Sequence, residues 1–129
     1  MSHTLRVYPK DELVIVRFTG DVFLSDLRTL ENMILQHTDY QLHYVGLYDF
    51  RESTKRYTHK DLLELIKLQP IHPDKGRWCS LNSTPVDTAL AMLYAVQRKG
   101  ENPFNVFSTI PAASDFLNRD LASRLKEFE

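Results

Sequence analysis

The residues of this 129-residue sequence that are best suited to chemistry follow a single apolar segment, LHYVGLYDF. The segment ends near Asp49, and Arg51, Ser53, Thr54 and Thr58 come shortly after it. A carboxylate, a guanidinium and several hydroxyls so close together could bind an anion, or could catalyse a hydrolysis with Asp49 as the base. The alternative is that Asp49 and Arg51, which share a face of an extended segment, form a surface ion pair worth at most about 1 kcal/mol.

Two further groups of polar residues lie at equivalent places, between an apolar strand and the start of a helix. They are Asn82-Ser83-Thr84 and Ser108-Thr109. The carboxyl ends of parallel strands meet at one edge of a sheet, and helix N-termini favour anions. The three junctions together are therefore a candidate site for a phosphate, a carboxylate or a phosphorylated side chain. The alternative is that the hydroxyls only cap their helices, for which Thr84 and Thr109 have the strongest context.

The hydrophobic pattern predicts the elements that would position these residues. Strands rich in β-branched and aromatic residues are predicted at 5–8, 13–19, 43–50, 77–81 and 104–107. The first helix is predicted to begin with Ser25 as its N-cap and to end near Thr38. The other helices are predicted from Thr58 to Pro70 and Pro73, from Thr84 to Gly100, and from Thr109 onward with a break near Asn118.

The order of these elements, ββαβαβαβα, predicts the fold class. Strands separated by helices imply right-handed crossovers and a mainly parallel sheet. The first two strands are joined by the short segment Pro9 to Glu12, which is of hairpin length, so this pair should be antiparallel. We therefore predict a single α/β domain over residues 1–129, with a mixed sheet of about five strands and helices packed on it.

Composition and charge argue against several classes of protein. The net charge of −1 gives no sign of the clustered basic surface that nucleic-acid-binding proteins usually have. No apolar run approaches the ~20 residues that a membrane span needs, and no signal segment is present, so a cytoplasmic protein is expected. The one cysteine, Cys79, excludes an intrachain disulfide and is predicted to be a buried structural thiol.

Neither a metal ion nor a cofactor is expected. The five histidines, His3, His37, His43, His59 and His72, lack the spacing of metal ligands. The four glycines form no GxGxxG motif or phosphate-binding loop, and GxSxG is absent. A small hydrolase therefore ranks last among the candidate functions.

Several segments together resemble the STAS-like domains, whose fold is that of the bacterial anti-sigma-factor antagonists, and especially their uncharacterised stand-alone bacterial branch. They are Phe18-Thr19-Gly20, Ser25-Asp26, Leu47-Tyr48-Asp49-Phe50-Arg51 and Val106-Phe107-Ser108-Thr109-Ile110-Pro111-Ala112-Ala113 with Phe116-Leu117. The similarity covers most of the chain. It implies the STAS-like fold and a regulatory role through protein partners, and a homodimer is the commonest assembly of such small domains.

In the antagonists, a serine or threonine at the helix after the central strand is phosphorylated by a partner kinase, which switches binding. The family has an Asp-Ser-Ser-Gly-like turn there, whereas this sequence has Asp49-Phe50-Arg51-Glu52-Ser53-Thr54 without the glycine. The resemblance implies that Ser53, Thr54 or Thr58 would take the place of the phosphoacceptor. We predict a non-catalytic regulatory domain with a kinase or anti-sigma-type partner. The alternative is a domain that binds a small anionic or lipid-like ligand.

Overall fold

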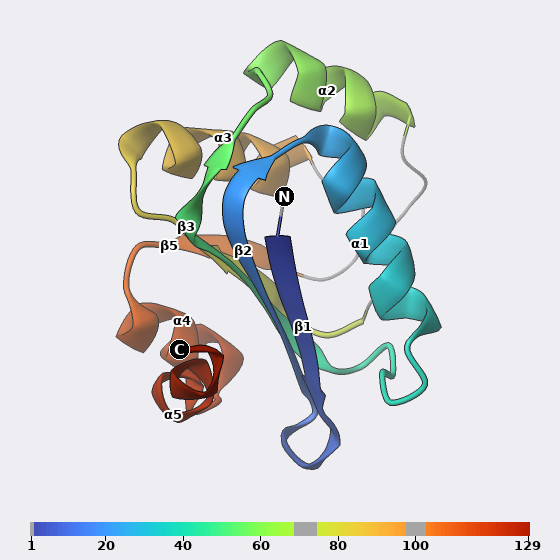
Figure 1. Ribbon diagram of the computed structural model, residues 1–129, viewed down its shortest axis with the longest axis vertical. Helices are drawn as coiled ribbons and strands as arrows, with labels where there is room; N and C mark the ends of the chain where they lie inside the picture. The colour runs from blue at the N-terminus through green and yellow to red at the C-terminus, as the bar shows by residue number, and fades with distance from the viewer. Residues whose placement is uncertain (1, 69–74, 98–102) are drawn as a thin grey trace.

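The computed structural model describes residues 2–68, 75–97 and 103–129 (Figure 1). Its centre is a five-stranded sheet in the order β1-β2-β3-β4-β5. The strands are β1 Ser2–Tyr8, β2 Leu13–Val22, β3 Val45–Lys55, β4 Trp78–Leu81 and β5 Phe104–Phe107. β1 pairs with β2 in antiparallel orientation, and the other neighbours pair in parallel. The predicted mixed sheet with an N-terminal antiparallel hairpin is therefore confirmed.

Helices cover both faces of this sheet (Figure 1). They are α1 Leu24–Gln36, α2 His59–Leu68, α3 Pro85–Gln97, α4 Ile110–Leu117 and α5 Leu121–Leu125, with the 3-10 turns η1 Pro9–Asp11 and η2 Lys126–Phe128. On one face, α4 and α5 cover Leu47 of β3, which packs in the same buried cluster as Leu117 of α4. On the other, α1 packs against Val16 of β2, and Leu62 of α2 meets Leu90 of α3. Because both faces are covered, the central strands are almost wholly apolar.

β3 is longer than the predicted strand, which ended at Phe50. The extension is polar, and no apolar alternation marks it in the sequence. It forms because β2 also continues and supplies a pairing partner: residues 19–22 of β2 pair with residues 52–55 of β3. The polar residues after Phe50, which lie outside the predicted strand, are therefore part of the sheet.

A β-bulge separates the apolar and polar halves of β3. Arg17 faces Asp49 and Thr19 faces Glu52, so the single residue Phe18 lies opposite two residues of β3. Side chains alternate between the faces of a sheet, and an extra residue inverts that alternation. The bulge therefore places Lys55 on the face that is covered by α1, α2 and α3.

The start of α1 differs from the prediction, which made Ser25 the N-cap. The N-cap position is Phe23, and its backbone N–H donates to the Asp26 carboxylate at 2.8 Å. A carboxylate in the first turn satisfies a free N–H and interacts favourably with the helix dipole. Asp26 therefore sets the start of the helix, and Ser25 is an exposed residue of the first turn.

The predicted break near Asn118 is confirmed. Asn118 ends α4 with a φ of 56°, a left-handed conformation that asparagine tolerates better than most residues. Two other predicted helix ends, at Pro70 with Pro73 and at Gly100, lie outside the described residues, as does His72.

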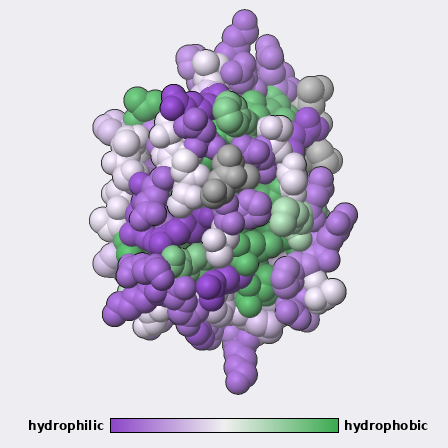
Figure 2. Space-filling model, viewed as in Figure 1, coloured by the Kyte–Doolittle hydropathy of each residue, from purple (hydrophilic) through white to green (hydrophobic). Residues whose placement is uncertain are grey.

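The surface of the described residues is mixed in character. Hydrophilic residues cover most of the face seen in Figure 2, and apolar atoms gather in the strip between β1 and α1. No described helix is long and apolar enough to cross a membrane. Within the same residue ranges, no three histidine, cysteine, aspartate or glutamate side chains come together as a group that could hold a metal ion.

Cys79 is completely buried in β4, which confirms the prediction of a structural thiol. Burial raises the pKa of its thiol to about 12, so the reactive thiolate is scarce as well as inaccessible. We expect iodoacetamide to leave the folded protein unmodified over a time in which the urea-unfolded protein is fully alkylated, as measured by intact mass. Rapid alkylation of the folded protein would contradict this burial.

Candidate functional site

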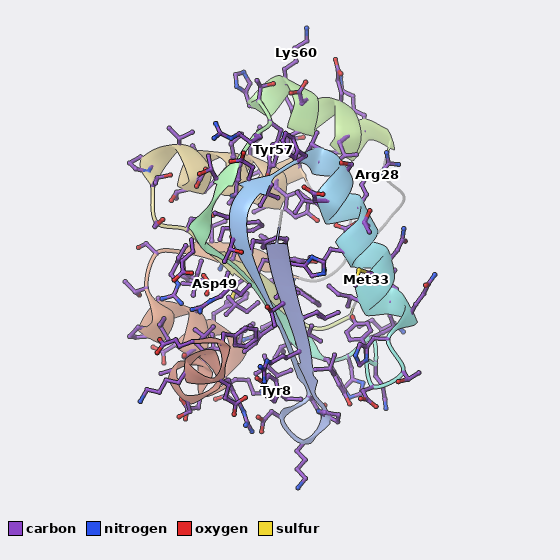
Figure 3. The ribbon with its side chains drawn as sticks, viewed as in Figure 1. Tyr8, Arg28, Met33, Asp49, Tyr57 and Lys60 are labelled. Atoms are coloured by element: carbon purple, nitrogen blue, oxygen red, sulfur yellow. The ribbon has the colours of Figure 1, made fainter. Side chains whose placement is uncertain are left out.

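Asp49 lies at the centre of an ion-pair cluster on the side of the sheet where α4 and α5 pack (Figure 3). Only 1% of its surface is exposed. Arg51 binds it through two hydrogen bonds of 2.9 Å, from Nε to Oδ1 and from Nη2 to Oδ2. Arg17 of β2 donates its Nε to Oδ2 at 3.2 Å and its Nη1 to the Phe128 carbonyl at 3.5 Å. Asp49 and Arg17 together therefore connect β3, β2 and the C-terminal turn η2.

These contacts make Asp49 unsuitable as a general base. Burial alone would raise its pKa, but hydrogen bonds and the charge of Arg51, followed by a hydrogen bond from Arg17, outweigh burial and hold the pKa below the usual 3.8. A carboxylate with so low a pKa is a poor proton acceptor near neutral pH. The hydrolase hypothesis thereby loses the base on which it depended.

The same carboxylate and a neighbouring serine satisfy backbone groups at the β-bulge. The Arg51 backbone N–H donates to Asp49 Oδ1 at 3.1 Å, and the Ser53 hydroxyl donates to the Phe50 carbonyl at 3.0 Å. An unpaired backbone group that is shielded from water costs about 1–3 kcal/mol. The polar residues that suggested chemistry in the sequence therefore stabilise the irregular backbone of β3.

The structure brings Asp49 level with the ends of β4 and β5, although β3 itself continues to Lys55. Leu81 of β4 is in register with Asp49 of β3 and with Phe107 of β5. Just beyond this line, the Ser83 hydroxyl donates to the Arg51 carbonyl at 3.1 Å, which links two of the three predicted junctions directly.

Most of the remaining candidate hydroxyls cap helices. The Asp61 N–H donates to Thr58 Oγ1 at 3.1 Å and the Thr58 N–H donates to Asp61 Oδ2 at 3.2 Å, which is a reciprocal capping box. Thr84 and Thr109 accept hydrogen bonds from the backbone N–H three residues later, at 3.1 and 3.3 Å. The geometry favours the capping interpretation for these three threonines. Thr54 in β3 and Ser108 after β5 are exposed.

Sequence reasoning missed a buried lysine at the end of β3. Lys55 is only 9% exposed, and its Nζ donates to Asn82 Oδ1 at 2.9 Å and to the Asp87 backbone carbonyl at 3.0 Å. Asn82 is itself completely buried and donates its Nδ2 to Ser80 Oγ at 3.0 Å. The predicted site residue Asn82 thus holds Lys55 in place. The burial of Lys55 follows from the β-bulge, and the local hydrophobic pattern of the sequence gives no sign of that bulge.

The outer face of α3 is apolar although it faces solvent. Val86, Met92 and Val96 are 70%, 56% and 78% exposed. Ala89, which is also exposed, lies three residues from both Val86 and Met92, so the four residues lie on one side of the helix. We call them the α3 row. The only charged residue of α3, Asp87, is buried. The outer face of a surface helix normally carries charged residues, and a contiguous apolar patch there is typical of a contact surface.

Comparison with known proteins identifies the fold. No protein-family model matches the sequence, and no curated protein matches it significantly. Solved structures do match: the sheet with one antiparallel edge and helices on both faces is the SpoIIAA-like fold of the STAS-like domains. The resemblance drawn from the sequence is therefore confirmed at the level of the fold.

Two solved structures illustrate this similarity. One is an uncharacterized protein of the DUF3478 family with a SpoIIAA-like fold from Shewanella loihica PV-4, with a TM-score of 0.54 and 16% identity over 90% of this chain and 92% of that chain. The other is the anti-sigma factor antagonist SpoIIAA in its unphosphorylated form, with a TM-score of 0.52 and 16% identity over 91% of this chain and 98% of that chain. Identity this low shows a shared fold, and function needs its own argument.

Proposed function

We propose that this protein is a non-catalytic regulatory domain that binds another protein through the apolar outer face of α3. The observation that carries the proposal is the α3 row, Val86, Ala89, Met92 and Val96, which exposes apolar side chains on a helix without a single charge on its outer face. The regulatory part of the proposal is supported by the fold that the chain shares with the anti-sigma factor antagonist SpoIIAA.

Burial of the α3 row would contribute substantially to binding. Moving a fully exposed valine or methionine side chain out of water contributes about 1.5–3 kcal/mol. Val86, Met92 and Val96 are each more than half exposed in this chain, so a partner that covers them gains more than half of such a contribution from each. A clustered set of this kind is the usual energetic centre of a protein interface.

The buried polar groups support a role without catalysis. The Asp49 carboxylate is occupied by Arg17 and Arg51, and its pKa is held low. The Cys79 thiol is buried and has a raised pKa. Neither group has the exposure or the protonation behaviour that a base or a nucleophile needs.

The proposal includes a switch at the junction after Asp49. Of the three expected phosphoacceptors, Thr54 is exposed, whereas Ser53 is half-buried and Thr58 caps α2. Phosphorylation of Thr54 would add a charge of about −1.5 to −2 opposite Asp21, its partner in β2. Repulsion between these two groups would loosen the end of the β2–β3 pair, and the strand-end region leads directly into α2.

Photo-cross-linking in cells tests the interface. We expect a benzophenone amino acid in place of Met92 to give a discrete adduct with a different protein, identified by mass spectrometry, in the organism that encodes this chain. Val96→Glu in the same protein should reduce the adduct about tenfold, because burying a carboxylate at an apolar contact is costly. Val96 is exposed in the free protein, so this variant should keep the wild-type unfolding temperature.

Met33 provides a matched control, because it is an exposed methionine on α1, 40% accessible and remote from α3 (Figure 3). The same probe at position 33 should not give the adduct. Identical adducts at positions 33 and 92, or an adduct only with a second copy of this chain, would contradict the proposed interface.

Thr54→Asp should change the adduct yield at position 92. An unchanged yield would contradict the proposed switch but not the proposed interface.

A further inference from the structure

A pocket of about 50 Å³, measured as the space open to the centre of a water molecule, lies between the sheet and helices α1, α2 and α3 and opens partly to solvent. Most of its lining is apolar, with aromatic side chains from Tyr48, Phe50, Tyr57, Tyr94 and Phe104. Tyr57 lies close to α2 and α3 at this end of the molecule (Figure 3). An apolar lining of this kind favours an apolar ligand.

The pocket also contains a cation, Lys55. Its Nζ lies 4.4 Å from the centre of the Phe50 ring, and both of its hydrogen-bond acceptors, the Asn82 amide oxygen and the Asp87 backbone carbonyl, are uncharged. An ammonium group has three N–H donors, so these two bonds leave one donor for another acceptor. Buried charges in proteins are normally paired, because an uncompensated charge in a low-dielectric site is costly.

The other titratable groups at the pocket leave much of this charge uncompensated. Burial lowers the pKa of Lys55 to about 8, and the Asp87 carboxylate only partly offsets burial. Burial and the same carboxylate raise the pKa of Tyr57, which keeps its hydroxyl protonated and able to donate. Glu31 also lines the pocket, from α1, and Lys55 is the positively charged side chain of the lining.

We propose that this pocket binds a small molecule with an apolar chain and a carboxylate head group, and that the head group pairs with Lys55. The chain lies against the aromatic rings, and the carboxylate of the ligand completes the charge compensation that Asp87 gives Lys55 only in part. The single positive charge of Lys55 matches a carboxylate monoanion better than a phosphate dianion. This site goes beyond the proposed regulatory function and does not depend on it.

Calorimetric titration of the full chain near neutral pH tests the site with defined probes. We expect decanoate to bind with saturation at one site and about tenfold more tightly than 1-decanol, which has the same chain length without the charge. Acetate, which has the head group without the chain, should show no measurable binding. Decyl phosphate should bind more weakly than decanoate, which distinguishes a carboxylate site from a phosphate site.

Two lysine variants test whether decanoate binding depends on the charge of Lys55 itself or on positive charge in general. Lys55→Met keeps an unbranched apolar side chain and removes the charge, so the decanoate affinity should fall about tenfold to that of 1-decanol. Lys60→Met changes an exposed lysine on the outside of α2 and should leave both affinities unchanged (Figure 3). Circular dichroism shows whether each variant is folded. If Lys55→Met is unfolded, Ala91→Leu fills the pocket from α3 and should weaken decanoate and 1-decanol together.

Three outcomes would overturn the proposal. Equal affinities of the wild type for decanoate and 1-decanol would show that Lys55 does not recognise the head group. Binding of neither probe would show that the pocket is not an apolar ligand site. Decanoate binding that is unchanged in folded Lys55→Met, or in folded Ala91→Leu, would place the ligand elsewhere.

Discussion

Asp49→Ala is expected to lower the free energy of unfolding by about 3–5 kcal/mol. The substitution removes the acceptor of Arg17 and Arg51, and it also leaves the Arg51 backbone N–H at the β-bulge without its partner. Because Asp49 is 1% exposed, water cannot replace these hydrogen bonds at little cost. Urea denaturation followed by circular dichroism measures the loss.

Asp21→Ala is the matched control, because Asp21 forms the same kind of carboxylate–arginine ion pair at the surface. Asp21 accepts a hydrogen bond of 2.8 Å from Arg56, but the two side chains are 50% and 54% exposed. An exposed ion pair of this kind contributes at most about 1 kcal/mol. Similar losses for Asp49→Ala and Asp21→Ala would show that the buried cluster is no more stabilising than a surface pair.

The contribution of Asp49 also depends on pH in a defined direction. Its pKa is lower in the folded protein than the usual 3.8, so its stabilising effect is complete above that value and is lost as the pH falls through the lower folded pKa. We therefore expect the difference in stability between wild type and Asp49→Asn to narrow as the pH is lowered below about 4. A difference that stays constant over this range would contradict the role of the ionised carboxylate.

Gly46→Ala is expected to destabilise the fold by about 3 kcal/mol, the upper end of the usual cost of overpacking a core. Gly46 pairs with Trp78 in the parallel β3–β4 ladder, and a Cβ built on Gly46 would overlap the indole ring. The ring cannot move aside easily, because Trp78 is buried and its centroid lies 5.0 Å from that of Tyr48. The free energy of unfolding, measured in urea, gives the loss.

Two comparisons separate this steric effect from the general cost of replacing glycine. Gly20 has a φ of +73° but open space around a built Cβ, so Gly20→Ala should cost only about 1–2 kcal/mol of backbone strain. In a Trp78→Leu background, the cost of Gly46→Ala should fall below about 1 kcal/mol, because the obstructing ring is gone. Additive effects of the two substitutions at positions 46 and 78 would exclude the overlap as the cause.

The sequence by itself determined the fold class and most of the element order. The β-branched runs of β2 and β3, the hairpin-length link between the first two strands, and the capping signals at Thr58, Thr84 and Thr109 all act over a few residues. Local interactions of this kind can be read from spacing and residue type alone. The same local reasoning placed Asp49 beside the ends of β4 and β5, which the register of the three strands confirms, although β3 continues past that line.

Only the tertiary structure decided what the polar run after Asp49 does. The run is held in the sheet because the distant end of β2 pairs with it, and the bulge opposite Phe18 reverses which face each side chain takes. Asp49, before the bulge, binds two arginines under α4 and α5, whereas Lys55, after the bulge, enters the pocket on the opposite face. A one-residue change in strand pairing has no local sequence signature here, because it depends on contacts between segments about thirty residues apart.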